Sequence, residues 1–213
     1  MFSSILELYS TTLILIIIIS FFIGSIPFGL ILSYFAGYGD IRKIGSGNIG
    51  ATNVLRSGNK LLAIITLFLD ALKGYIPIMI VIKYFPELLQ LSCLIVFLGH
   101  LFPIWIKFKG GKGVATYLGI LFALSLQLSL LFMFTWLVVL LIFKYSSVSS
   151  MFSSLTVFIV TLIKDSALSA INQNIYINED IKIILFTFLI LIIFTHRKNI
   201  LNLKNNKEKK IKI

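Results

Sequence analysis

Long apolar stretches dominate this sequence, and they restrict it to folds that lipid can surround. A helix needs about 20 apolar residues to cross the ~30 Å hydrocarbon core of a bilayer. Stretches of roughly this length lie at 9–33, 61–83, 88–106, 148–163 and 181–195. Hydrophobic residues make up 58% of the 213 residues, which is more than a soluble domain of this size buries. The sequence therefore predicts an all-α, polytopic membrane protein.

A further apolar block, 114–143, is 30 residues long and is too long for one ordinary crossing. Its most polar point lies around Gln127, between Ser125 and Ser129, so we expect two short helices that turn near Gln127. The N-terminal run 11–22 is interpreted as part of the first transmembrane helix. It lacks the basic segment before it and the small-residue cleavage site after it that a signal peptide has.

Charge indicates how these spans are oriented. The chain has 19 Lys and Arg residues against 8 Asp and Glu, a net charge of +11. In a membrane protein this excess indicates orientation rather than nucleic-acid binding, because basic loops stay in the cytoplasm. The segments expected inside are 37–60, 107–113 and the tail 196–213, and the acidic segment expected outside is 164–180. These positions agree only if the block 114–143 crosses twice. We therefore predict one integral-membrane domain over 1–213 with seven transmembrane helices, the N-terminus out and the C-terminus in.

The first polar cluster is the glycine-rich segment 39–56. Its candidate ligand-binding residues are Gly45, Ser46, Gly47, Asn48, Thr52, Asn53 and Arg56. Glycines let the backbone turn tightly and bring N–H groups against an anion, and Arg56 adds a guanidinium fork that suits phosphate. No GKS or GKT follows, so this is not a P-loop. A plain flexible loop would not need so many hydroxyl, amide and basic groups, so we expect the segment to bind a phosphate.

The second cluster spans residues 99–116, where glycines surround a lysine at the start of a predicted helix. Its candidate binding residues are Gly110, Gly111, Lys112 and Gly113. A lysine at this position supplies a point charge for an oxyanion or phosphate, with backbone amides beside it. His100, ten residues upstream of Gly110, has two interpretations, as a packing residue or as a functional one.

A third cluster, 144–150, is rich in serine and includes Ser147 and Ser150. Serines at the start of a helix cap it, but capping needs only one of them, so a second role stays open. The span 61–83 carries Asp70 and Lys73, which lie three residues apart on one helical face. Charges inside a span are costly unless they pair or face a polar cavity, so this pair is either structural or directed at the site, and Lys73 is kept as a candidate binding residue.

The fourth cluster follows the last span and contains His196, Arg197 and Asn199, with Glu208 further along. Basic residues alone would suffice to end a membrane span, and His196 and Asn199 are surplus to that task. By the predicted topology all four clusters lie at the inner membrane surface. Together their charges suit one or two phosphate-bearing ligands whose lipidic part lies between helices.

At these clusters the chain resembles the bacterial acyl-phosphate-dependent glycerol-3-phosphate acyltransferases, the PlsY family. The motifs that carry the resemblance are Gly24-Ser-Ile-Pro27, Asp40-Ile-Arg with Gly45-Ser-Gly-Asn-Ile-Gly-Ala-Thr-Asn53 and Arg56, Asp70-x-x-Lys-Gly74, Gly99-His with Phe102-Pro103, Lys109-Gly-Gly-Lys-Gly-Val-Ala-Thr116, and His196-Arg-x-Asn-Ile200 with Glu208. They cover nearly the whole chain in one order. The family's seven-helix, N-out topology agrees with the charge count.

The resemblance implies transfer of a fatty acyl group from acyl phosphate to the 1-hydroxyl of glycerol 3-phosphate, which gives lysophosphatidic acid, the first step of phospholipid synthesis. It implies no cofactor and no metal, a bacterial inner membrane with the active site at the cytoplasmic face, and functional coupling to the enzyme that makes acyl phosphate. Carried over by motif, the residues expected to line the polar site are Ser46, Asn48, Arg56, Lys112, Ser147, Ser150, His196 and Asn199. Of these, the catalytic candidates are Ser46, Arg56, Lys112, His196 and Asn199. The glycines at 110, 111 and 113 would shape the acyl-phosphate loop, and Glu208 matches an acidic position of the tail motif. The chain departs from the family pattern at Asn202, where Arg is usual, and at Asn206, where Gly is usual.

Acyl phosphate is an activated mixed anhydride, so direct attack by the hydroxyl needs no protein nucleophile. It needs orientation, stabilisation of the developing oxyanion and a proton acceptor. Either His196 or the phosphate of the substrate can take that proton. The main alternative function is a transporter or scramblase for a phosphorylated solute or lipid. It would need polar residues at mid-membrane and on both sides of the membrane, whereas this sequence has almost none on the outer side.

Overall fold

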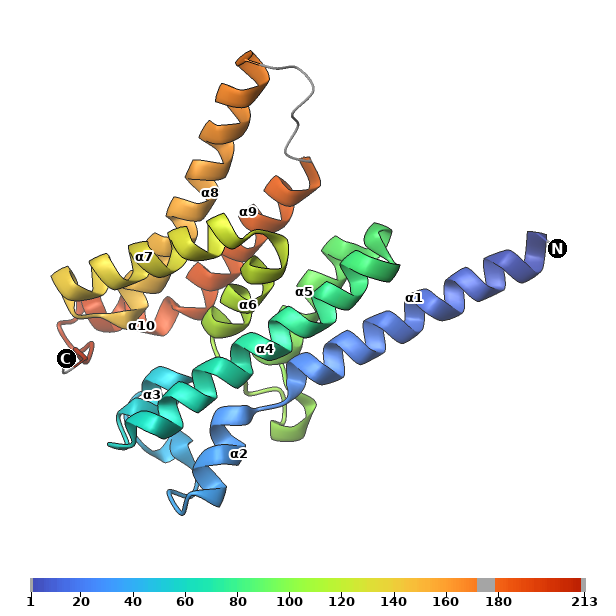
Figure 1. The fold of residues 1–213 in the computed structure, drawn as a ribbon. Helices are drawn as coiled ribbons and strands as arrows, with labels where there is room; N and C mark the ends of the chain where they lie inside the picture. The colour runs from blue at the N-terminus through green and yellow to red at the C-terminus, as the bar shows by residue number, and fades with distance from the viewer. Residues whose placement is uncertain (1, 172–178, 212–213) are drawn as a thin grey trace. The chain divides into compact units, whose positions relative to one another are not determined.

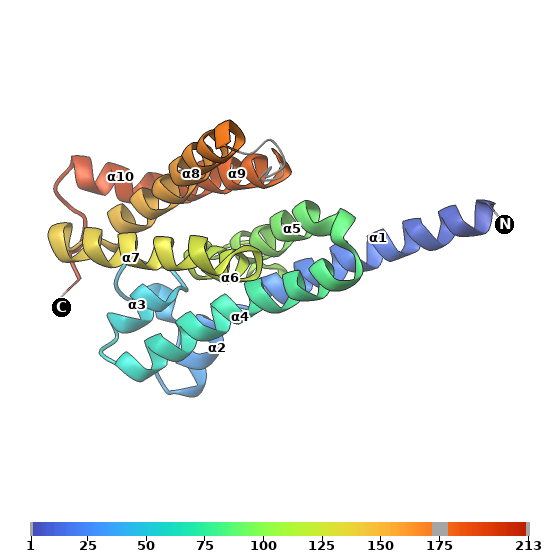
Figure 2. The same ribbon diagram turned by 45° about the horizontal axis from the view of Figure 1, so that its top comes forward.

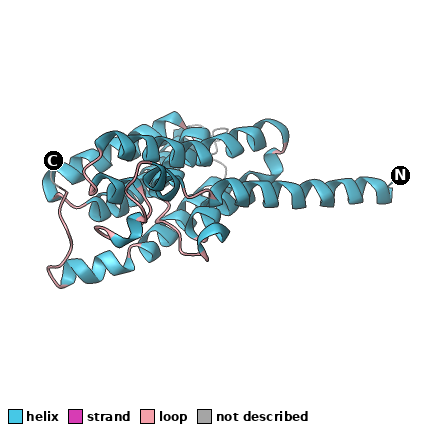
Figure 3. Ribbon diagram, turned by 90° about the horizontal axis from the view of Figure 1, so that it is seen from below, coloured by secondary structure: helices cyan, strands magenta, loops and turns pink. Residues whose placement is uncertain are grey.

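The computed structural model describes the backbone of residues 2–171 and 179–211, and the side chains of 11–164 and 181–211. Every regular element in these residues is a helix (Figure 3), so the all-α prediction is confirmed. The chain divides into two compact units, Met1–Ala123 and Leu124–Ile213. The prediction of one domain over the whole chain stays a prediction.

The first unit contains five α-helices and most of a sixth (Figure 1). They are α1 (Phe2–Ser25), α2 (Phe28–Phe35), α3 (Ala51–Leu55), α4 (Lys60–Tyr84), α5 (Leu89–Leu101) and α6 (Val114–Leu124). Short 3₁₀ turns lie at Ile41–Lys43, Pro86–Leu88 and Ile104–Ile106. Helices α2 and α3 both pack on α4 (Figure 2).

Close contacts between glycines and neighbouring backbones hold the long helices of this unit together. Helix α5 packs on α1 and α4. A methyl group at Gly99 would lie against the Phe21 carbonyl oxygen of α1, and one at Gly24 would meet the Val96 carbonyl of α5. Small residues of this kind let membrane helices approach closely, which raises their van der Waals contact in the absence of a hydrophobic drive.

The second unit contains α7 (Leu126–Phe143), α8 (Ser146–Ile171), α9 (Glu179–Thr195) and α10 (Arg197–Lys204). Helix α8 packs on both α7 and α9. Trp136 of α7 donates its indole N–H to the Ser150 hydroxyl of α8 at 3.2 Å, and the rings of Phe158 and Phe186 join α8 to α9 with centroids 5.3 Å apart.

In the described part of the chain, four helical segments are individually long and apolar enough to cross a membrane: Lys60–Tyr84, Pro86–Ile106, Leu126–Phe143 and Ser146–Lys164. The number rises to six if two bent pairs each form one span. One pair joins α1 to α2 through a bend of 41°, and the other joins α9 to α10 through a bend of 52°.

The block 114–143 does divide into two helices, as expected, but at Ser125 rather than Gln127. Ser125 has extended backbone angles, φ −165° and ψ 121°, and its hydroxyl accepts from the Leu128 N–H at 3.4 Å as the cap of α7. Helix α6 has 11 residues and therefore rises only about 16 Å. Seven spans and the orientation of the termini stay predictions. The acidic side chains of residues 165–180, on which the outer position of that segment depends, lie outside the described residues.

Candidate functional site

The glycine-rich segment 39–56 is built around one buried amide, that of Asn53, which is 1% exposed. Its oxygen accepts from the backbone N–H of Ser46 at 2.7 Å and from the Ser46 hydroxyl at 3.1 Å. Its NH₂ group donates to three backbone carbonyl oxygens, those of Ile41 at 2.9 Å, Ile44 at 3.1 Å and Asn48 at 2.7 Å. The Asn53 amide thus orders the loop that carries the other candidates, and ligand binding by Asn53 stays a prediction.

Glycine is required at Gly45 for two reasons. Its φ of +61° is in the left-handed region, and a methyl group there would overlap the Asn53 side-chain oxygen. Gly47 also has positive φ, +73°, and Ser46 between them is exposed. The Asn48 side-chain oxygen is buried with no hydrogen-bond partner. The loop therefore presents the Ser46 side chain at its surface, and the half-buried Thr52 and Arg56 follow on α3 and at its end.

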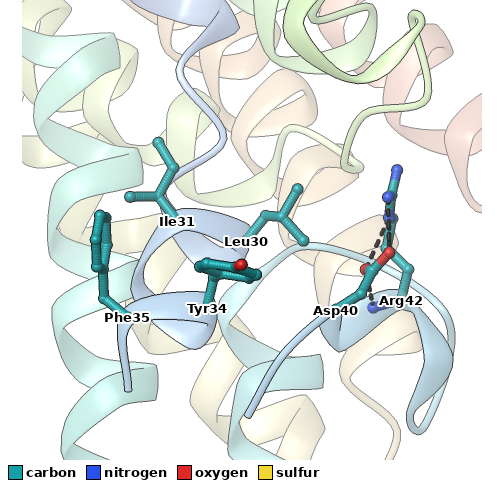
Figure 4. A pocket seen from close by; sticks show the side chains of 6 residues that line it. All are labelled: Leu30, Ile31, Tyr34, Phe35, Asp40 and Arg42. Atoms are coloured by element: carbon teal, nitrogen blue, oxygen red, sulfur yellow. Dashed lines mark hydrogen bonds and ion pairs between the residues drawn. The ribbon is translucent and has the colours of Figure 1, made fainter. Parts of the chain in front are cut away.

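An ion pair lies beside this loop. Asp40 accepts three hydrogen bonds from the guanidinium of Arg42, the shortest at 2.7 Å, and one from its backbone N–H. The hydrogen bonds from Arg42 lower the pKa of Asp40 from 3.8 to about 2. Both residues line an open cavity of about 380 Å³ with four apolar side chains, Leu30, Ile31, Tyr34 and Phe35 (Figure 4). None of the predicted site residues lines it.

A second ion pair is buried inside the first unit. The Lys73 ammonium lies 2.7 Å from an Asp70 carboxylate oxygen, and each side chain is 2% exposed. Lys73 also donates to the backbone carbonyl oxygen of Ile26 at 2.6 Å. His100 Nδ1 lies 3.8 Å from the same Asp70 oxygen. Lys73 was a candidate binding residue, and the structure places it in this buried network.

The loop with Gly110, Gly111, Lys112 and Gly113 folds onto the C-terminal end of α5. The Gly110 N–H donates to the Leu101 carbonyl at 3.1 Å, and the Gly111 N–H donates to the His100 carbonyl at 3.1 Å. Gly113 has φ +83°, and a methyl group there would overlap the Phe97 ring. Helix α6 begins at the next residue, so half-buried Lys112 stands two residues before a helix start, as the spacing predicted.

Glu208 joins the tail to the start of α8 in the second unit. One of its carboxylate oxygens accepts from the Ser147 hydroxyl at 2.9 Å and from the Asn199 side-chain amide at 2.7 Å. The Ile211 N–H donates to the Lys144 carbonyl at 2.8 Å a few residues further on. The structure thus brings three predicted site residues together: Ser147, Asn199 and Glu208.

The hydroxyl of Ser150 has protein partners on two sides. It accepts from Trp136 and donates to the Ser146 carbonyl at 2.9 Å, and the residue is 1% exposed. Arg197 is exposed; its guanidinium lies 4.4 Å from the Phe194 ring centroid and donates to the Phe194 carbonyl at 3.3 Å. These contacts explain both residues structurally.

His196 lies between α9 and α10 and is 2% exposed. Its Nδ1 lies 2.7 Å from the Ile192 carbonyl oxygen. Because a carbonyl oxygen only accepts, this contact assigns the ring proton to Nδ1 in the neutral form and leaves the lone pair on Nε2. The contact with the Ile192 carbonyl fixes the orientation of the ring.

The two departures from the family pattern have a local account in the tail. Asn206 has φ +55°, and after Gly, Asn is the residue that tolerates this conformation best. The Lys207 N–H then donates to the Asn202 carbonyl at 2.7 Å, which closes α10. Asn202 contributes this bond through its backbone, and its side chain is exposed.

Sequence reasoning left the role of His100 open and gave Asp40 and Arg42 none. The signal for His100 was present, since Gly99-His100 shortly precedes the glycine loop in the sequence. For metals, no three His, Cys, Asp or Glu side chains in the described part of the chain lie close enough to hold an ion.

Comparison with known proteins agrees with this arrangement of motifs. The family model described as glycerol-3-phosphate acyltransferase matches residues 14–206. A glycerol-3-phosphate acyltransferase of Pelagibacter ubique is 48% identical over 194 residues, 91% of this chain and 95% of that protein. One from Mesorhizobium japonicum is 47% identical over 199 residues, 93% of this chain and 96% of that protein.

Two solved structures are also similar. Both are crystal structures of PlsY (YgiH), described as an integral membrane glycerol 3-phosphate acyltransferase. The glycerol 3-phosphate form has a TM-score of 0.84 and 33% identity, and the lysophosphatidic acid form has 0.82 and 32%. Each comparison covers 94% of this chain and 96% of the other. The chain therefore belongs to the glycerol-3-phosphate acyltransferase family of PlsY type, and it is an integral membrane protein.

Proposed function

We propose that this protein transfers a fatty acyl group from acyl phosphate to the 1-hydroxyl of glycerol 3-phosphate. The observation that carries the proposal is the match to two solved relatives, one described with glycerol 3-phosphate and one with lysophosphatidic acid. These are the acceptor and the product of the proposed reaction. The donor is proposed from the family resemblance of the motifs.

The reaction is direct. The hydroxyl oxygen of glycerol 3-phosphate attacks the acyl carbonyl carbon, the carbon–oxygen bond to phosphate breaks, and inorganic phosphate leaves. The hydroxyl proton passes to a phosphate of the substrates or to His196. The products are lysophosphatidic acid and phosphate, with no covalent acyl-enzyme.

Cationic and glycine-rich residues supply the phosphate binding in this proposal. Arg56 presents a guanidinium, which pairs with phosphate oxygens in a bidentate way. Lys112 stands at the end of a glycine loop, and there its ammonium binds the phosphate of the acyl phosphate. Ser46 is the exposed hydroxyl of its loop. Lys73 is proposed to act through the fold, since Asp70 and the Ile26 carbonyl occupy its ammonium.

The second unit, by itself, contains a histidine with a fixed ring and an asparagine whose amide is held in place. The Nδ1–H of His196 is held by a carbonyl, so Nε2 is the nitrogen that can accept a proton. Glu208 holds the Asn199 amide at 2.7 Å, which orients the remaining amide hydrogen and oxygen. This support favours Glu208 as a positioning residue for Asn199 and Ser147.

The cellular setting follows from the same proposal. The donor is a lipid and the acceptor is a soluble phosphate ester, so the reaction belongs at a membrane surface. We propose the bacterial inner membrane with the active site facing the cytoplasm, where an enzyme that makes acyl phosphate can supply the donor directly.

The experiment uses the full chain, purified in detergent, with palmitoyl phosphate and radiolabelled glycerol 3-phosphate. Labelled lysophosphatidic acid should form together with one phosphate per acyl group transferred. Palmitoyl-CoA in place of palmitoyl phosphate should give no product, and activity with it would refute the proposed donor. Absence of product with both donors, together with uptake of glycerol 3-phosphate into liposomes, would replace the enzyme with a transporter.

His196→Gln separates the two proton acceptors. Turnover kept within about tenfold of the native rate would exclude His196 as the base, because positioned general-base catalysis contributes roughly 100-fold or more. Loss of at least that factor, with the KM for each substrate unchanged, would assign the proton to His196.

A further inference from the structure

The C-terminal end of α5 shapes the glycine loop, and different atoms of α5 limit the space at Gly110 and at Gly111. Both glycine N–H groups that join the loop to α5 donate to carbonyl oxygens of the last turn, at 3.1 Å each. A methyl group at Gly110 would overlap the backbone carbonyl oxygen of His100. A methyl group at Gly111 would instead overlap the imidazole ring of His100, with Nε2 as the nearest atom. The His100 ring therefore forms the wall against which Gly111 lies.

The other side of this ring faces the buried ion pair. His100 is 3% exposed, its Nδ1 has no hydrogen-bond partner, and an Asp70 carboxylate oxygen lies 3.8 Å from that nitrogen. Asp70 is held in turn by Lys73, which is tied to the Ile26 carbonyl at the end of α1. The Asp70–Lys73 ion pair thus lies on one side of the His100 ring, and Gly111 lies against the other side.

We infer that His100 is a positioning residue for the glycine loop, and that its ring sets where Lys112 meets the donor phosphate. The inference rests on the proposed function for the choice of ligand, and on the geometry alone for the loop. Because His100 is 3% exposed and its ring lies against Gly111, it acts through the loop and not by proton transfer.

Kinetics should show a binding defect. In the proposed function Lys112 binds a phosphate that is present in both the bound donor and the transition state, so a shift of Lys112 removes uniform binding. His100→Ala should raise the KM for palmitoyl phosphate by about tenfold to a hundredfold, with kcat changed less than about threefold. His100→Asn is too short to reach Gly111 and should behave alike, which covers the case that the Ala variant does not fold.

A suppression experiment separates positioning from general packing. Gly111→Ala and Gly110→Ala should each raise the same KM, since each methyl group meets an occupied position. His100→Ala removes the ring atoms that obstruct a methyl group at position 111, but it leaves the carbonyl oxygen that obstructs one at position 110. The pair H100A/G111A should therefore have a KM no higher than G111A alone, whereas in H100A/G110A the two defects should multiply.

A protease measurement tests the loop without reference to activity. Trypsin reaches the half-buried Lys112 when the loop opens, and it cuts after the exposed tail lysines Lys207 and Lys209 in any case. In full-length H100A, cleavage after Lys112 should rise by about tenfold or more, as expected when local opening becomes less costly, with tail cleavage unchanged.

The outcomes are distinct. If the double variant H100A/G111A multiplies the two single defects, or if loop cleavage in H100A equals that of the native chain, the inference is wrong. If the native chain makes no lysophosphatidic acid from acyl phosphate, the proposed function fails, and the protease result still decides the inference about the loop.

Discussion

The buried Asp70–Lys73 pair allows a prediction whose size follows from the structure. The two charges lie 2.7 Å apart at 2% exposure each. At an effective dielectric constant of about 20 their attraction is roughly 6 kcal/mol. Desolvation costs several kcal/mol for each ion, so the intact pair is close to neutral for stability. Removing one partner is different, because it leaves the other charge buried and uncompensated.

Asp70→Leu should therefore lower the free energy of unfolding by about 3–5 kcal/mol. The double variant D70L/K73M replaces both charges with apolar groups and should recover most of this loss. It should stay about 1 kcal/mol below the native chain, because the Ile26 carbonyl loses the hydrogen bond from Lys73.

The assay is equilibrium unfolding in mixed detergent micelles, followed by tryptophan fluorescence and by the fraction of monodisperse protein. Asp40→Asn, a carboxylate removed outside the membrane spans, is the matched control and should lose less than about 1 kcal/mol. The reasoning is refuted if D70L costs less than about 1 kcal/mol, or if D70L/K73M is as unstable as D70L.

Three further predictions test other contacts. Gly99→Ala should destabilise the fold by about 1–3 kcal/mol in equilibrium unfolding, because its methyl group meets only backbone atoms of α1. Gly50→Ala is the control: a methyl group there has open space around it, so the free energy of unfolding should change little. Asn206→Gly should be neutral or stabilising at its φ of +55°, and Asn206→Val should lower thermal stability. Arg42 lowers the Asp40 pKa from 3.8 to about 2, so the stabilisation from this ion pair should be complete above about pH 4 and lost as the pH falls through about 2. The free energies of unfolding of the native and Asp40→Asn proteins should therefore differ above about pH 4 and become equal below about pH 2.

Several features of the fold were predictable because they depend on local pattern. Apolar length predicted long apolar helices, and the serine-rich break in 114–143 predicted the division into α6 and α7 to within two residues. Glycines in the segment 39–56 were expected to let the backbone turn tightly, and Gly45 and Gly47 do have positive φ. These signals act within a few residues of each other, so a single sequence carries them.

The partners of individual polar side chains were not predictable in the same way. Asn53 and Lys73 were candidates for ligand binding by residue type, and the structure shows both engaged inside the protein. The residue types that bind phosphate are also those that satisfy buried backbone carbonyls. Only the fold decides between these uses, because it determines whether the group faces a carbonyl or open space.

By itself the sequence determined that lipid surrounds the protein, that its fold is all-α, and which family it belongs to, since the length of apolar runs and the order of motifs are properties of the chain alone. The tertiary structure determined which polar groups pack against the glycine loop, such as His100. His100 lies ten residues before Gly110 and thirty after Asp70, yet its ring stands between the glycine loop and the ion pair. That arrangement depends on how α4, α5 and the loop pack, and packing between segments distant in sequence is set by shape and burial rather than by any local pattern.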